Sequence, residues 1–254
     1  MYKRLLLAIG VVLISGCAST KQSSAELEKI NKEQMFVEAN NYPQLIEFYK
    51  NELRQQESTE ARLKLGQAYL DHGDAESALF VVSQLPKQAR SSQSELILAK
   101  AFFALEQLEE AQQHIENVLQ FDRRNGEAYN LLGVIQATQG DLTQAEQNFV
   151  QSRREFYQDN AVKNNLATLY LIQKQYHKSY QLLRSVYQAN PDDQTTRANL
   201  IITLIKLERI DEAKELLASD YKAGEVSAII DFISAQEVSV STLPSTPEQQ
   251  HETH

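Results

Sequence analysis

The stretch EAYNLLGVIQATQGDLTQAEQNF, residues 127–149, predicts two amphipathic helices separated by a tight turn. Gly133 and Ala145 are small residues in the middle of the two apolar faces, where they let the paired helices approach closely. Between them, Gly140 and Asp141 are typical of a turn followed by a helix N-cap. One such hairpin cannot bury its apolar face alone, so we expect neighbouring segments to continue the stack.

The same pattern occurs five times along the chain. The first-helix column is Gly66, Ala99, Gly133, Ala167 and Ile201, and the second-helix column is Ala78, Ala111, Ala145, Ser179 and Ala213. Both columns advance by 33 or 34 residues, and a 34-residue period with this pattern is the tetratricopeptide-repeat (TPR) signature. The sequence therefore predicts an all-α TPR α-solenoid of antiparallel helix pairs, with five TPR units over residues 59–225.

The segments outside the five units are expected to close the stack or to lie outside it. Residues 25–58 predict a degenerate N-terminal helical pair, and residues 226–238 predict a C-terminal capping helix. Residues 239–254 are polar and contain two prolines, which predicts a disordered tail. Residues 17–24 are interpreted as a cysteine followed by a short polar tether.

The N-terminal segment has the order of a secretory signal. Two basic residues precede the apolar run 5–14, which is about half as long as the roughly 20 residues that a membrane span needs. Residues 1–16 are therefore predicted to be a signal peptide. Cys17 is the only cysteine of the chain, so it can form neither an intramolecular disulfide nor a multi-cysteine metal site.

The residues before Cys17, LISGC at positions 13–17, resemble the bacterial lipobox. The resemblance implies a lipoprotein signal peptide, with Cys17 as the acylated first residue of the mature chain. Ala18 and Ser19 follow in place of the aspartate that retains such lipoproteins at the inner membrane. The resemblance thus implies an outer-membrane, lipid-anchored protein facing the periplasm, while an ordinary signal peptide with a free thiol remains the alternative.

Composition argues against several functions. The formal charge is −9, and removal of Lys3 and Arg4 with the signal leaves 23 − 34 = −11, which disfavours nucleic-acid binding. The five histidines have no carboxylate or second histidine at ligand spacing on one helix face, so we expect them on the surface. The sequence contains no glycine-rich phosphate loop and no nucleophile elbow. We therefore expect no enzyme activity, no catalytic residues, no metal site, no cofactor and no small-molecule substrate.

The first helices of stacked TPR units line a concave groove, which is the expected partner-binding site. The candidate polar contacts are Asn130, Asn164, Asn165 and Asn199, because an asparagine can both donate to and accept from a peptide backbone. Apolar pockets beside them are expected from Phe103, Leu131, Val134, Leu171 and Ile202. The alternative is that the asparagines only tie neighbouring first helices together.

Motifs in the C-terminal half resemble the TPR lipoproteins of the tight adherence (Tad, Flp pilus) assembly system, the TadD family. They are Asn-Asn-Leu-Ala at 164–167, Arg-Ala-Asn-Leu at 197–200, and the helix that begins near Glu225 and Val226. With the lipobox, the resemblance spans nearly the whole chain, although Ile201, Ile202 and Lys206 depart from the smaller residues expected there. It implies a protein-binding adaptor of a pilus secretion machine, with the secretin or its accessory proteins as partners. A pilotin of a type IV pilus secretin and a general periplasmic scaffold for envelope-biogenesis proteins are the alternatives.

Overall fold

The computed structural model describes residues 18–238. The predicted signal peptide (1–16), Cys17 and the predicted tail (239–254) lie outside the described residues.

Every regular element in residues 18–238 is a helix. The helices are α1 (Ala18–Glu38), α2 (Tyr42–Gln55), α3 (Thr59–Asp71), α4 (Ala75–Ser83), the short 3-10 helix η1 (Lys87–Ala89), α5 (Ser92–Ala104), α6 (Leu108–Phe121), α7 (Gly126–Thr138), α8 (Leu142–Arg154), α9 (Asp159–Ile172), α10 (Tyr176–Ala189), α11 (Gln194–Lys206), α12 (Ile210–Leu217) and α13 (Ala223–Ala235). The five predicted units correspond to α3–α12, with α1–α2 before them and α13 after them. The predicted all-α TPR solenoid is therefore confirmed.

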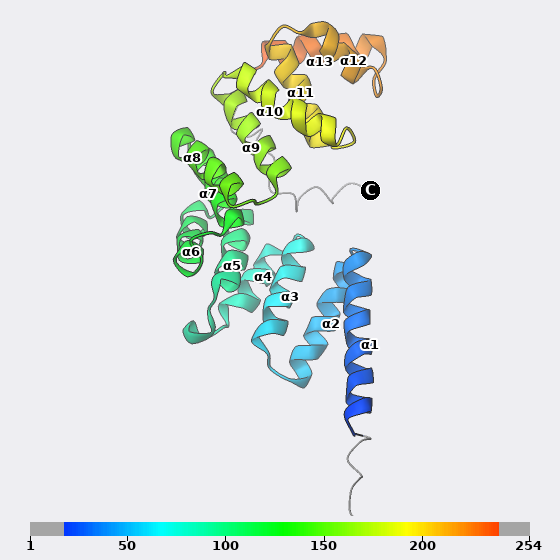
Figure 1. Ribbon diagram of the computed structural model, residues 1–254, viewed down its shortest axis with the longest axis vertical. Coiled ribbons are helices and arrows are strands. Elements are labelled where there is room, and N and C mark those ends of the chain that lie inside the picture. The colour runs from blue at the N-terminus through cyan, green and yellow to red at the C-terminus, as the bar shows by residue number, and fades with distance from the viewer. Residues whose placement is uncertain (1–17, 239–254) are drawn as a thin grey trace, which may run out of the picture.

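The helix pairs stack into a curved array (Figure 1). We call the first helices of the five units, α3, α5, α7, α9 and α11, the A helices, and their partners the B helices. Each A helix contacts its own B helix and the A helix of the next unit. Figure 1 shows α5 and α7 on the inner side of the curve and α6 and α8 on its outer side, so the A helices line the concave face.

The two helices of each pair are joined by a turn of the same backbone geometry. One residue in each of the five A-to-B connections has a left-handed backbone, Gly73, Glu106, Gly140, Lys174 and Glu208, and so has Asn40 between α1 and α2. At Gly140, its N–H donates to the Ala137 carbonyl (3.1 Å) and the following N–H, of Asp141, donates to the Gln136 carbonyl (2.8 Å). This is the double hydrogen bond of a Schellman motif, which satisfies carbonyls at the end of the A helix. Because Asn40 between α1 and α2 makes the same turn, the N-terminal pair is built like the TPR units.

The N-caps that follow these turns agree in part with the sequence. The Asp141 carboxylate accepts from the Gln144 N–H (3.2 Å) and the Asp74 carboxylate accepts from the Ser77 N–H (2.9 Å), as their positions predict. In the fifth unit the N-cap of α12 is Arg209, which makes no side-chain cap. The B helix of that unit is also short, at eight residues.

The small-residue columns mark where A and B helices touch. A Cβ on Gly133 would lie 2.7 Å from Cε1 of Phe149 on α8, and a Cβ on Gly66 would lie 2.4 Å from Cγ2 of Val82 on α4. Ala99 and Ala167 occupy the same position in their units and are fully buried. Close approach of the paired helices is thus the physical reason for the column.

The ends of the array differ from the expected boundaries. Helix α1 begins at Ala18, so residues 18–24, predicted to be a tether, are helical. These residues are polar and have no apolar pattern, so the sequence does not predict these additional turns, about two at 3.6 residues per turn. The capping helix runs over Ala223–Ala235 and not 226–238, and it buries Val226 and Ile230 against the last unit.

Phe156 has an unusual conformation for its residue type. It is the one described residue outside the A-to-B turns with a left-handed backbone (φ 60°), and its side chain is 88% exposed. It closes α8 with the same double hydrogen bond, in which the Tyr157 N–H donates to the Ser152 carbonyl (3.3 Å). Glycine is the usual residue at this position because it has no Cβ to clash with the following carbonyl.

Phe156→Gly is expected to stabilise the protein by about 0.5–1 kcal/mol. Relief of left-handed strain, about 1–2 kcal/mol, exceeds the added chain entropy of glycine, about 0.5–1 kcal/mol. The urea unfolding midpoint measures the change, with Phe156→Ala as the matched control that keeps a Cβ. If Phe156→Gly were no more stable than Phe156→Ala, the claim that the left-handed backbone at position 156 is strained would be contradicted.

Candidate partner-binding surface

The four predicted asparagines come together as a ladder between A helices. Asn165 on α9 donates its Nδ2–H to Oδ1 of Asn130 on α7, at 2.9 Å. Asn164 on α9 donates to Oγ1 of Thr196 on α11 at 2.7 Å, and Asn199 on α11 donates to Oγ1 of Thr168 on α9 at 3.3 Å. Three successive A helices are thus linked by amide hydrogen bonds.

These asparagines are buried, with 2–7% of each residue exposed. Their burial and their bonds to one another match the alternative stated above, in which the asparagines tie neighbouring A helices together. A partner peptide would have to compete for amide groups that are already bonded, so peptide binding by them stays a prediction. Asn164 Oδ1 is buried and has no hydrogen-bond partner among the described residues.

The predicted apolar pocket residues separate into two groups. Leu131, Val134 and Leu171 are 1–2% exposed and fill the space between neighbouring helices, so the expectation that they offer an accessible pocket is corrected to a core role. Phe103 on α5 and Ile202 on α11 are half-buried and keep accessible surface. Helical periodicity places all five near the inner face but does not distinguish groove from core.

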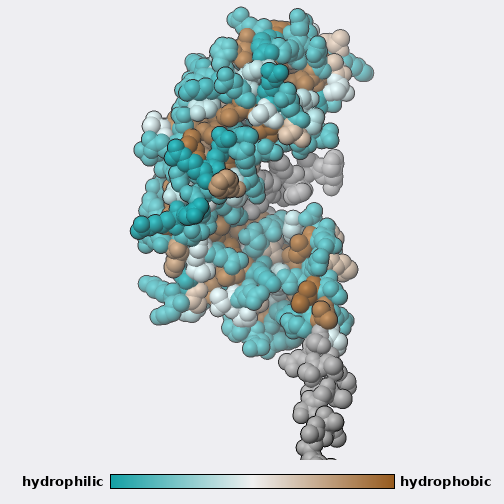
Figure 2. Space-filling view, in the orientation of Figure 1, coloured by the Kyte–Doolittle hydropathy of each residue, from teal (hydrophilic) through white to brown (hydrophobic). Residues whose placement is uncertain are grey.

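An accessible column lies at the ends of the A helices. The last residues of α3, α5, α7, α9 and α11 are Asp71, Ala104, Thr138, Ile172 and Lys206, and we call them the rim column. Ala104 and Thr138 are exposed, and the other three are half-buried. Figure 2 shows the space-filling surface hollowed on the concave side, between α1–α4 and α9–α13. The rim column, with Phe103 and Ile202, therefore offers accessible surface along the ends of the A helices.

A second hollow lies between α1, α2 and α3. Its volume is about 1180 Å³, and its walls combine the apolar Ile30, Val37 and Phe48 with charged residues. Glu33 accepts from the Tyr49 hydroxyl (2.9 Å) and from Lys64 Nζ (2.9 Å) across it. Burial and the bond to Glu33 raise the pKa of Tyr49, while the pKa of Glu33 is lowered because those bonds outweigh its desolvation. Ion pairs between Lys64 and Glu33 and between Lys29 and Glu52 join the helices that line the hollow.

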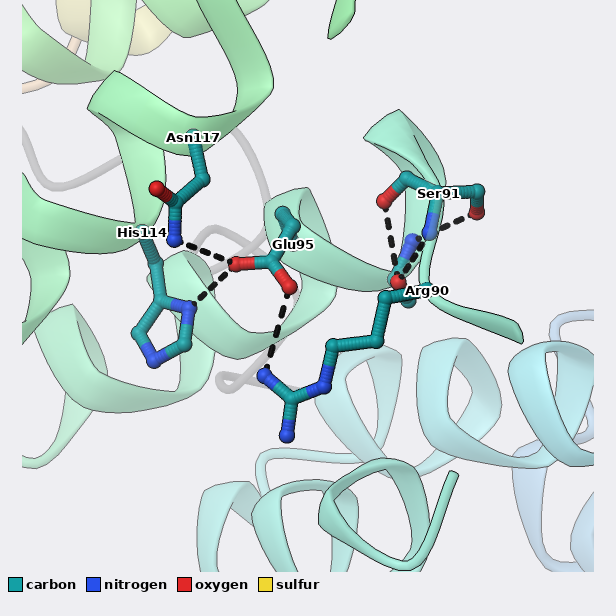
Figure 3. A network of polar contacts seen from close by, with 6 residues as sticks. Arg90, Ser91, Glu95, His114 and Asn117 are labelled. Atoms are coloured by element: carbon teal, nitrogen blue, oxygen red, sulfur yellow. Dashed lines mark hydrogen bonds and ion pairs between the residues drawn. The ribbon is translucent and has the colours of Figure 1, made fainter. Parts of the chain in front are cut away.

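A buried polar network crosses the second TPR unit (Figure 3). Glu95 on α5 is 2% exposed, and its carboxylate accepts from Nδ1 of His114 (2.7 Å) and from Nδ2 of Asn117 (3.0 Å) on α6. Arg90, just before α5, donates to the other oxygen at 3.2 Å, and the His114 ring stacks on Phe102. The expectation that every histidine lies free on the surface is wrong for His114, because its carboxylate partner comes from the neighbouring helix.

The network favours the ionised form of the Glu95 carboxyl. Burial alone would raise the pKa of Glu95, but hydrogen bonds from Asn117, His114 and Arg90 outweigh it and hold the pKa below its ordinary value. The network fixes α5 against α6. Because its partners come from α6 and from the residue before α5, we assign it a structural role.

The comparisons with known proteins agree with this architecture. Residues 19–231 match the family described as the cilia and flagella-associated protein 70 C-terminal domain, a TPR family. The chain belongs to this TPR family. No curated protein is significantly similar to the chain.

Solved TPR structures share the fold of this family member at low sequence identity. A thermophilic TPR protein of Thermus thermophilus is 18% identical over 71% of this chain and 99% of its own, with a TM-score of 0.61. The APC/C hetero-tetramer Cut9–Hcn1 is 14% identical over 78% of this chain and 40% of its own, with a TM-score of 0.67. PilF of Pseudomonas aeruginosa is 17% identical over 69% and 86%, with a TM-score of 0.57. At such identities the likeness shows the fold alone.

Membership of this TPR family indicates a scaffold for protein–protein interaction. The described residues contain no group of three or more His, Cys, Asp or Glu side chains arranged to hold a metal ion. Between residues 18 and 238, no helix has the length and apolar character needed to cross a membrane.

Proposed function

We propose that this TPR protein is an outer-membrane lipoprotein that serves as a protein-binding adaptor in a Tad/Flp-type pilus secretion machine. The observation that carries the proposal is an accessible rim column on the concave face of a TPR array whose N-terminal sequence resembles a lipobox. The resemblance of residues 164–167 and 197–200 to the TadD family supports the pilus assignment. The partners are then the secretin or its accessory proteins.

In this proposal the protein acts by binding alone. The asparagine ladder and the small-residue columns keep the A helices in register, so the rim column presents a fixed surface. A partner segment lying across several A helices gathers many weak contacts without a large ordering cost to the scaffold. The lipid on Cys17 keeps this surface close to the outer membrane, where a secretin is met.

Blocking the rim column tests the partner-binding role. Ala104→Arg with Thr138→Arg places two long charged side chains on exposed positions of the concave face, so folding is expected to be normal and surface pili are expected to be lost. The matched control is Gln113→Arg with Gln147→Arg, at exposed positions of the B helices α6 and α8. Pilus display is measured beside circular dichroism of the purified variants. Normal pili in the rim variant would refute binding through the concave face.

Cys17→Ser tests the anchor separately. Because the proposed acylation of Cys17 anchors the chain and a serine there would carry no lipid, we expect the wild type in the outer-membrane fraction and the variant in the soluble periplasm or unprocessed. Fractionation and immunoblotting measure the distribution. Recovery of the variant in the outer membrane at the wild-type level would contradict lipidation.

The variants with a blocked rim column also distinguish a pilus adaptor from a general periplasmic scaffold. If the rim variant leaves pili intact but disturbs another envelope process, the concave face works for partners outside the pilus system. That outcome would retain the adaptor and overturn the Tad assignment.

A further inference from the structure

The chain that follows α13 is fixed across the ends of two A helices. Lys206, the last residue of α11, donates from Nζ to the Ile233 carbonyl (2.7 Å) and to the Ser234 carbonyl (3.3 Å), and it also reaches the Gln236 carbonyl. A lysine here satisfies carbonyls at the C-terminal end of α13 and complements its dipole. Lys206 therefore binds both the last turn of α13 and the residue that follows it.

The next contact lies one A helix further back along the array. Glu237 accepts from Nζ of Lys174, which follows α9, at 3.0 Å. Residues 234–238 share a pocket of about 290 Å³ with Leu171, Lys174, Tyr176 and Lys206. From α13 the chain thus passes α11 and arrives at α9, moving along the rim column toward α7 and α5.

The segment after Val238 has the length and composition to continue on this path. Residues 239–247 read SVSTLPSTP, with Val240 and Leu243 as apolar side chains and prolines that favour an extended backbone. Nine extended residues span roughly 28 Å at about 3.1 Å per residue. The axes of α9 and α5 lie two helix spacings apart, about 16–20 Å. The segment is therefore long enough to cross α9, α7 and α5.

We propose that residues 239–247 occupy the concave face as an internal ligand. Val240 and Leu243 lie against the rim column at Ile172 and Thr138, and the segment covers the surface between Ile202 and Phe103. The inference rests on the concave face being a binding surface, as in the proposed function. A partner must then displace this segment before it binds.

Covalent attachment makes weak contacts sufficient. A segment held next to its site has an effective concentration in the millimolar range, so even a weak isolated affinity keeps the groove occupied. The same segment adds few buried contacts, so its loss is expected to change the melting transition little.

Disulfide trapping tests the position of the segment, because Cys17→Ser gives a cysteine-free background. Leu243→Cys with Thr138→Cys is expected to oxidise rapidly, since docking brings the two Cα atoms within the roughly 7 Å that a disulfide allows. Leu243→Cys with Gln147→Cys, an exposed position on α8, is the matched control and is expected to stay reduced. Gel mobility with and without reductant measures both, and circular dichroism checks folding. Equal oxidation of the two pairs, or none at position 138, would overturn the proposal.

Competition with a free peptide provides a second readout and separates this inference from the proposed function. A fluorescent peptide of residues 238–247 is titrated into the Cys17→Ser chain and into the same chain carrying Val240→Ser and Leu243→Ser. We expect about tenfold or more tighter binding to the second chain, whose groove is open. If the peptide bound equally to both chains, or bound to neither, the proposal of an internal ligand would be refuted. Partner binding through the concave face would not be affected by that result.

Discussion

Gly133→Ala is expected to destabilise the protein by about 1–3 kcal/mol, and Gly133→Leu by about 3 kcal/mol or more. The alanine Cβ would lie 2.7–2.8 Å from two ring carbons of Phe149, which is fully buried. The two helices of the third TPR unit must then separate, and the third unit loses part of its contact with its neighbours. The urea midpoint and the thermal transition measure the loss.

Gly224→Ala is the matched control for this substitution. Gly224 is also helical, in the first turn of α13, and a Cβ there meets nothing within 4 Å. We expect Gly224→Ala to be neutral or slightly stabilising, because alanine has the higher helix propensity. Equal destabilisation at both positions would contradict close helix approach as the reason for the small-residue column, because Gly→Ala in a helix is otherwise stabilising.

Glu95→Ala is expected to cost about 3 kcal/mol at neutral pH. The substitution removes the buried carboxylate that Arg90, His114 and Asn117 share, and it leaves these three half-buried polar groups without their common acceptor. Glu116→Ala on the exposed side of α6 is the control, since Glu116 accepts only an exposed hydrogen bond from Gln112. Urea unfolding of the two variants measures the difference.

The stabilisation by Glu95 is also expected to depend on pH. Because the pKa of Glu95 is lower in the folded protein than in the unfolded chain, its contribution is present above the unfolded value of about 4.3. It is lost as the pH falls through the folded pKa. The stability difference between wild type and Glu95→Gln should therefore be present at pH 5 and shrink below about pH 4. A difference that grows between pH 5 and pH 3 would contradict the sign of the shift.

The repeat columns predicted the architecture because their physical cause is local. Gly133 and Ala145 face each other within one hairpin, and the spacing of such pairs fixes the number and order of the units. The turn between α1 and α2 follows the same geometry through Asn40. The sequence did not predict that residues 18–24 are helical, because these residues have no apolar pattern that marks a helix. In the structure α1 nevertheless begins at Ala18.

The candidate surface was predicted less well because it depends on angles between units. Helical periodicity correctly predicts that Asn130 and Asn164 lie on the inner side of their helices. Their burial depends on how closely the next A helix packs, which the periodicity does not predict. The partnership of Glu95 with His114 joins residues 19 positions apart on different helices. A search for ligand spacing along a single helix cannot detect this hydrogen bond. The one signal in the sequence is Glu95 itself, a glutamate on the apolar face of α5, where a hydrophobic residue is expected.

The central claim, that a protein partner is bound on the concave face, is tested most directly by photo-crosslinking in cells. A photoreactive amino acid is placed at Thr138 on the rim column or at Gln147 on α8, both exposed, and adducts are identified by mass spectrometry. The account predicts an adduct with a component of the pilus secretion complex at position 138 and none at position 147. An adduct with that complex at position 147, with none at position 138, would contradict it.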